Sequence, residues 1–76
     1  MKIKISNLPL WIDEIEIKRH FESFGELLLV ILLFDSKGAS TGIAELIFAT
    51  EAAAFEALAM HGGEIHGSII KVELIG

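Results

Sequence analysis

Histidine and serine are the residues whose chemistry would be most distinctive in this chain, and neither is grouped with a partner in the sequence. The histidines are His20, His61 and His66, and the last two flank the glycines of one loop. Imidazoles placed there could ligate zinc, but the chain has no cysteine and no paired carboxylates close to them. We therefore predict no metal site, and we expect His20 to be a partly buried, hydrogen-bonded side chain.

The five serines give no indication of catalysis. They fall at expected turns and caps, and no histidine is placed beside any of them. A serine nucleophile needs a base within hydrogen-bond reach, so hydrolase chemistry is not indicated. We predict a non-enzymatic chain with no catalytic residues and no cofactor.

Acidic side chains outnumber basic ones by 11 to 6, which gives a formal net charge of −5 at pH 7. Such a charge opposes a nucleic-acid partner, because non-specific affinity comes from neutralising phosphates with lysine and arginine. The one adjacent basic pair is Lys18-Arg19, with His20 beside it. The charge therefore predicts that RNA binding is weak or absent.

Length and hydrophobicity predict one globular domain. The chain has 76 residues, 53% of them hydrophobic, and we assign residues 1–76 to a single domain. Its apolar run Leu27–Phe34 is far shorter than the roughly 20 residues of a membrane-spanning helix, so we predict a strand there. The chain start has no apolar secretory region, and nothing in it indicates export or a membrane partner.

Alternation and capping signals predict the element order β-α-β-β-α-β. Lys2 to Ser6 alternates polar and apolar residues, as in a strand with one buried face. Asp13 followed by Glu16 resembles a capping box, for a helix that Gly25 would end. The remaining expected elements are a strand Leu27–Phe34, a strand Gly42–Phe48, a helix capped by Thr50 and running to Met60, a small strand at Glu64–His66 and a last strand Ser68–Ile75. This order is the ferredoxin-like α+β arrangement.

Three segments resemble the RNA recognition motif (RRM) family across essentially the whole chain. They are the strand Ile3-Lys4-Ile5-Ser6-Asn7-Leu8, the helix end His20-Phe21-Glu22-Ser23-Phe24-Gly25 and the strand Ser40-Thr41-Gly42-Ile43-Ala44-Glu45-Leu46-Ile47-Phe48. Within the family, Phe34-Asp35, Gly38 and the pattern Ser40-x-Gly42-x-Ala44-x-Leu46-x-Phe48 look most like the Aly/REF mRNA-export adaptors.

The resemblance implies a four-stranded antiparallel sheet in the order 4-1-3-2, with two helices behind one face. Alternation along the strands then assigns residues to the two faces. Expected toward the helices are Ile3, Ile5, Val30, Leu32, Ala44, Leu46, Phe48, Ile70, Val72 and Leu74. Expected on the open face, which the family uses for RNA, are Lys4, Ile31, Leu33, Ile43, Glu45, Ile47, Lys71 and Glu73.

The base-stacking platform of the family is missing from this chain. The family usually carries aromatic residues where this chain has Lys4, Ile43 and Glu45, and those rings stack RNA bases. We expect Lys4 and Glu45 to meet across neighbouring strands, so that Glu45 competes with a phosphate for the ammonium group. RNA binding at these platform positions is therefore predicted to be weak or absent.

A protein-contact patch is a second possible use of the surface. Ile31, Leu33 and Ile47 join Ile43 in an apolar strip on the open face, and exposed strips of this kind often mark partner sites. Trp11 in the first loop is either an exposed anchor for a partner or packs back over the helix end. One interpretation is that these residues serve a protein partner or self-association. The other is that isoleucine and leucine were selected for β-propensity and burial, without any partner.

Two functional interpretations follow from this pattern. The main prediction is a non-enzymatic scaffold without RNA binding, redesigned or artificial, because the frame is intact, the platform is replaced and the loops lack the family's basic residues. The alternative is an RNA-binding or protein-interaction domain of the Aly/REF type, which would use the open face or the helix and loop surface. The resemblance implies a nuclear protein, although the chain carries no targeting signal.

Overall fold

The computed structural model describes all 76 residues and has the element order expected from the sequence. The elements are β1 (Lys2–Ser6), α1 (Glu14–Phe21), β2 (Leu27–Phe34), β3 (Ser40–Phe48), α2 (Glu51–Ala57), β4 (Glu64–Ile65), β5 (Ser68–Ile69) and β6 (Lys71–Leu74). Each helix continues into a short 3₁₀ turn, at Glu22–Phe24 and at Leu58–Met60. No helix is long and apolar enough to cross a membrane.

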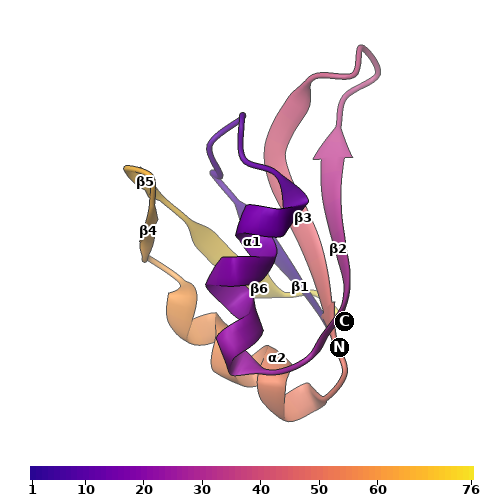
Figure 1. The fold of residues 1–76 in the computed structure, drawn as a ribbon, viewed down its shortest axis with the longest axis vertical. Coiled ribbons are helices and arrows are strands. Elements are labelled where there is room, and N and C mark those ends of the chain that lie inside the picture. Colours follow the sequence, from indigo (N-terminus) through magenta and orange to yellow (C-terminus); the bar gives the residue numbers. More distant parts are fainter.

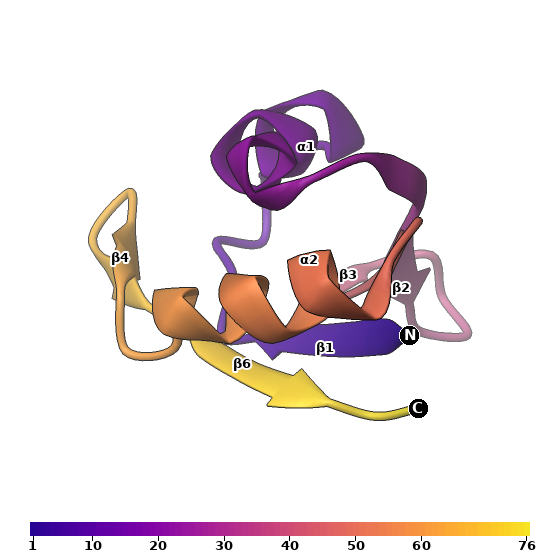
Figure 2. The same cartoon turned by 90° about the horizontal axis from the view of Figure 1, so that it is seen from below.

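Two layers make up the domain: a four-stranded antiparallel sheet, and the two helices that cover one of its faces (Figures 1 and 2). The strand order is β2-β3-β1-β6, which confirms the predicted order 4-1-3-2 with β6 as the fourth strand. The two chain ends lie side by side, because the Lys2 amide donates to the Gly76 carbonyl across 2.8 Å. The other face of the sheet is left uncovered by helices.

The predicted last strand, Ser68–Ile75, is wrong as a single element. Ser68 and Ile69 instead pair with Glu64 and Ile65 to form the separate β4–β5 hairpin, and only Lys71–Leu74 joins the main sheet. The break falls at Ile70, whose amide donates to the Gly63 carbonyl and whose carbonyl accepts from the Gly62 amide. These bonds extend the β4–β5 pairing by one step toward the loop after Met60, and they keep Ile70 out of the main sheet.

Helix α1 begins where the capping signal predicts. The side chain of Asp13 accepts a hydrogen bond from the Glu16 amide across 2.9 Å, which satisfies one of the free donors of the first turn. The second half of the expected capping box is absent, because the Glu16 carboxylate contacts histidines and does not return to the cap. Gly25 ends the following 3₁₀ turn, as expected.

Helix α2 packs closely against its neighbours because its inward residues are small. Thr50 caps it by accepting from the Ala53 amide across 3.1 Å, and Ala53, Ala54 and Ala57 are buried. A Cβ added at Gly25 would lie only 2.5 Å from the Cβ of Ala53. The turn after α1 can therefore pack against α2 only because residue 25 is glycine.

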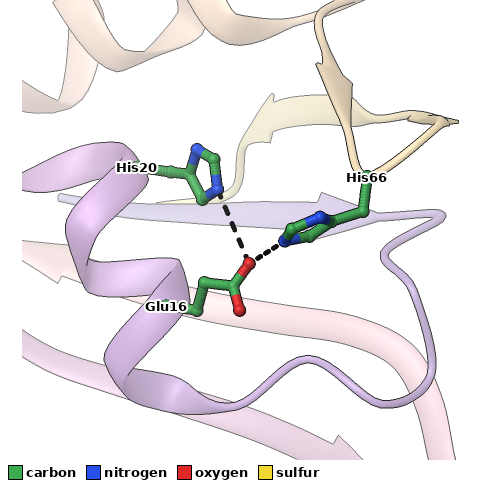
Figure 3. Close-up of side chains that lie close together, drawn as sticks. All are labelled: Glu16, His20 and His66. Carbon is green, nitrogen blue, oxygen red and sulfur yellow. Dashed lines mark hydrogen bonds and ion pairs between the residues drawn. The ribbon is translucent and has the colours of Figure 1, made fainter.

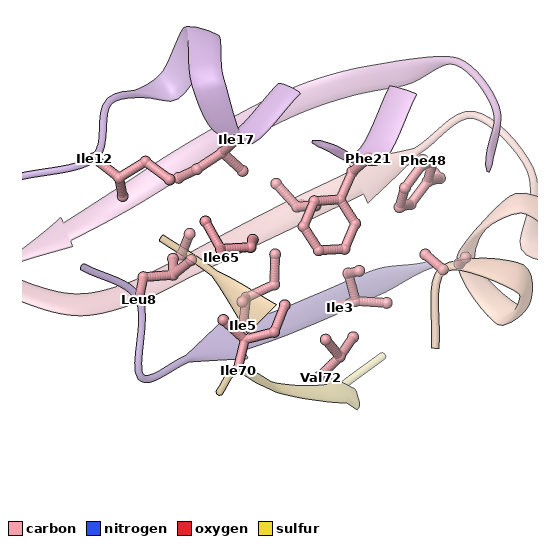
Figure 4. Close-up of a cluster of buried hydrophobic side chains, with 14 of the residues drawn as sticks. Ile3, Ile5, Leu8, Ile12, Ile17, Phe21, Phe48, Ile65, Ile70 and Val72 are labelled. Carbon is pink, nitrogen blue, oxygen red and sulfur yellow. The ribbon is translucent and has the colours of Figure 1, made fainter. Parts of the chain in front are cut away.

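The core lies between the helices and the covered face of the sheet (Figure 4). Its fully buried members include Ile3 and Ile5 from β1 and Ile17 and Phe21 from α1. The expected core strand residues are buried or packed against this core, with one exception. Leu74 was predicted to be buried but is 36% exposed, because it ends the edge strand β6.

Candidate nucleic-acid interface

Strand register places the candidate residues on the open face. Lys4 on β1 lies at the centre, directly opposite Glu45 on β3 and Glu73 on β6. Directly paired residues of antiparallel strands point to the same side of the sheet. The other pairs on this face are Leu33 with Ile43, Ile31 with Glu45, Leu29 with Ile47, Lys2 with Ile47, and Ser6 with Lys71. The three platform positions are thus adjacent.

A β-bulge sets the register of β2, which the uniform apolar run Leu27–Phe34 could not reveal. Leu27 pairs with the buried Phe48 and Leu29 pairs with Ile47, so Leu28 is one extra residue. In a regular strand, Leu27 and Leu29 would face the same side, because side chains two residues apart share a face. The bulge lets Leu27 pack against the core while Leu29 joins the open face.

The ion pairs on the open face differ from those expected. Glu45 pairs with Lys2, whose Nζ lies 3.4 Å from its Oε1, and Glu73 pairs with Lys71 at 3.7 Å. Lys4 takes part in none of the ion pairs of the structure, although it lies between both acids. The predicted meeting of Lys4 and Glu45 across neighbouring strands is confirmed by their register, but no ion pair joins the two side chains. The two carboxylates are engaged by other lysines, and the ammonium of Lys4 stays available.

The apolar strip of the open face consists of Leu29, Ile31, Leu33, Ile43 and Ile47. These residues come from β2 and β3, and their register pairs set them side by side. All are at least partly exposed. The strip borders the row that contains Lys4, because Ile43 and Ile47 are the diagonal neighbours of Lys4 across the β1–β3 pair.

Trp11 does not belong to the same surface as this strip. Its side chain is 67% exposed, and its ring packs against the ring of His66, with the centroids 4.8 Å apart. His66 also contacts Glu16 of α1, so Trp11 lies on the helix side of the molecule. The predicted patch of Trp11, Ile31, Leu33 and Ile47 is therefore two separate surfaces.

A polar cluster on the helix side was missed by the sequence analysis. Glu16 and His20 project from one face of α1, and His66 reaches them from the β4–β5 turn (Figure 3). His20 is partly buried, as expected, but the expected hydrogen bond is not formed, since its Nε2 lies 4.0 Å from Glu16 Oε2. The spacing of four residues between Glu16 and His20 was a local signal for this cluster. No local signal indicated His66, because it lies 50 residues away from Glu16 in the sequence.

Comparison with known proteins decides the family. The profile described as RNA recognition motif matches residues 3–71, which is nearly the whole chain. The chain belongs to the RNA recognition motif family. The RRM assignment made from the sequence motifs is confirmed, and the open face described above is the family's usual RNA face, here without its aromatic rings.

Curated relatives of this RRM are plant proteins of greater length. It is 37% identical to a pentatricopeptide repeat-containing chloroplastic protein of Arabidopsis thaliana, over 96% of this chain and 8% of that protein. It is 30% and 32% identical to THO complex subunits 4B and 4A of the same plant, over 99% of this chain and 26% and 31% of theirs. These two subunits are Aly/REF-like, which confirms the predicted closeness to that type. The chain spans less than a third of each relative.

Solved structures show the same fold. The RNA15 RRM superposes with a TM-score of 0.90 at 18% identity, over 97% of this chain and 87% of that one. The second RRM of a yeast poly(U)-binding protein gives a TM-score of 0.87 at 19% identity, over 99% of this chain and 93% of that one. At these identities the likeness concerns the fold alone, and it confirms the ferredoxin-like RRM architecture.

Proposed function

We propose that this RRM is a non-enzymatic module that contacts single-stranded RNA weakly through its open sheet face, with Lys4 as the central phosphate contact. The observation that supports this most is that the ammonium group of Lys4 forms no ion pair. It lies in the middle of the face and is free of ion pairs, whereas the acids on either side of it are paired with Lys2 and Lys71. A bound phosphate could therefore approach Lys4 without breaking an existing pair.

The neighbouring aliphatic side chains define the rest of the proposed contact. Ile43 and Ile47 lie diagonally beside Lys4, and bases can rest on them by apolar contact. Aliphatic side chains lack the ring stacking worth about 1–3 kcal/mol per base in other single-strand binders. With a net charge of −5 in addition, we expect a Kd of about 10⁻⁴ M or weaker at physiological salt.

Replacement of Lys4 tests this proposal. Lys4→Gln is expected to weaken binding of a short single-stranded RNA and to reduce the slope of log K against log salt by about 0.7, since one phosphate contact is lost. Fluorescence anisotropy between about 50 and 200 mM salt measures both effects. The matched control is Lys37→Gln, which removes the same charge from the exposed β2–β3 turn. Equal losses of RNA affinity in the two variants would mean that Lys4 acts only through the net charge of the domain, and would contradict a direct phosphate contact.

A second candidate function is a protein contact through the apolar strip of β2 and β3. The observation that favours it is the side-by-side arrangement of five partly exposed aliphatic residues. Sedimentation of the same samples separates this candidate from RNA binding, because concentration-dependent association without an RNA response would support a protein-binding face. The inert, redesigned scaffold stays a prediction. The natural relatives favour the alternative, in which the domain binds RNA or protein.

A further inference from the structure

Three potential metal ligands converge on the helix side, far from the open face. Glu16 and His20 come from α1, and His66 comes from the turn between β4 and β5 (Figure 3). The Nε2 atoms of both histidines approach the same oxygen, Glu16 Oε2: His66 contacts it, and His20 lies 4.0 Å from it. All three ligand atoms lie within 4.8 Å of one another. Each group therefore offers a lone pair to one small volume.

The backbone fixes the directions of these side chains. Residues four apart on a helix lie on the same face, which aligns Glu16 with His20. His66 and Gly67 form a two-residue hairpin turn with φ of 49° and 84°, between the paired residues Ile65 and Ser68. Ile65 is only 1% exposed and anchors this hairpin in the core. Asn, Asp or Gly is the usual choice at the first position of such a turn, and histidine is among the other residues that adopt a positive φ more readily.

We propose that Glu16, His20 and His66 bind a divalent transition-metal ion of the Zn²⁺ class. Two imidazole nitrogens and one carboxylate oxygen are a ligand set that zinc uses, with bonds of about 2.0–2.2 Å. Ligands at such distances lie roughly 3.3 Å apart in a tetrahedron, so small side-chain rotations close the site. Mg²⁺ and Ca²⁺ prefer oxygen ligands and do not suit this set.

Accessibility and an open coordination position complete the case for the site. The side chains of Glu16, His20 and His66 are 31%, 36% and 43% exposed, so an ion can enter from solvent. Three protein ligands leave a fourth position for water. Bound metal would link α1 to the β4–β5 hairpin, two elements that at this surface are already joined by the contact of His66 with Glu16 and the edge-on approach of the His20 and His66 rings.

The decisive variant is His66→Asn, because asparagine suits the turn while it removes the ligand. The matched control is His61→Asn, at the histidine outside the cluster. His61 Nδ1 accepts from the Val72 amide across 3.0 Å, and asparagine can keep an acceptor there. Titration of each protein with ZnCl₂ by calorimetry gives the affinity. The emission of Trp11, the only tryptophan, gives a second readout, because its ring packs on His66.

We expect the wild-type chain and His61→Asn to bind one Zn²⁺ equally, with a change in Trp11 emission and a higher melting temperature. His66→Asn and His20→Gln should each bind at least about tenfold more weakly, since even the partners of metal ligands are worth that much. Excess Mg²⁺ should not compete. The proposal is overturned if the wild type binds Zn²⁺ no more tightly than His66→Asn does, or if His61→Asn weakens binding as much as His66→Asn.

Discussion

The double substitution Ile43→Phe and Glu45→Phe is expected to tighten binding of single-stranded RNA more than any other change in this domain. Both residues lie on the open face beside Lys4, at positions where the family usually carries rings. Each new ring offers stacking of about 1–3 kcal/mol per base, which corresponds to roughly 5- to 150-fold in affinity. Loss of the Glu45 carboxylate also removes a charge that repels phosphate. Anisotropy titration at fixed salt measures the gain.

A ring on the other side of the molecule provides the control. Ile15 is 64% exposed on α1, so Ile15→Phe adds exposed aromatic surface without touching the open face. Its affinity for RNA should equal that of the wild type. If the double variant folds normally and binds RNA no better than Ile15→Phe, the open face is not the RNA-contacting surface.

The largest expected loss of stability comes from Phe21→Ala. Phe21 is fully buried on α1, and its ring lies 6.2 Å from that of Phe24. Removing a buried phenylalanine side chain costs about 3–5 kcal/mol. A domain of this length has only about 4–11 kcal/mol of unfolding free energy in total, so roughly a quarter to all of its stability would be lost. Denaturant unfolding followed by circular dichroism measures the change.

Phe55→Ala is the matched control on the second helix. Phe55 is 52% exposed, so its truncation should cost about 1 kcal/mol or less. Similar losses at Phe21 and Phe55 would contradict the arrangement of the core between the helices and the sheet.

The sequence predicts those parts of the fold that depend on local signals. Alternation located β1 and β3, and the oxygens of Asp13 and Thr50 marked the starts of both helices. Composition alone does not give the register of β2, because every residue of Leu27–Phe34 is apolar. The family resemblance predicted the faces of Val30 to Leu33, but the bulge at Leu28 leaves no trace in the sequence. The split of the last strand depends on bonds between Ile70 and the distant Gly62 and Gly63, which no local pattern encodes.

The candidate sites were predictable to a similar extent. Strand alternation was enough to bring Lys4, Ile43 and Glu45 to one face. The partner of Glu45 was not predictable, because Lys2 and Lys4 both reach that face and flexible side chains decide which of them pairs. The cluster of Glu16, His20 and His66 could not be predicted from the sequence, because it forms only when the β4–β5 turn lies against α1.

An amide NMR titration of the wild-type domain with short single-stranded RNA at low salt tests the central claim most directly. The account predicts fast-exchange shifts centred on Lys4, Ile43 and Glu45, with the helix side unaffected and with steep weakening as salt rises. Unchanged spectra at excess RNA, or shifts confined to α1 and the loops, would contradict the assignment of the open sheet face as the RNA contact.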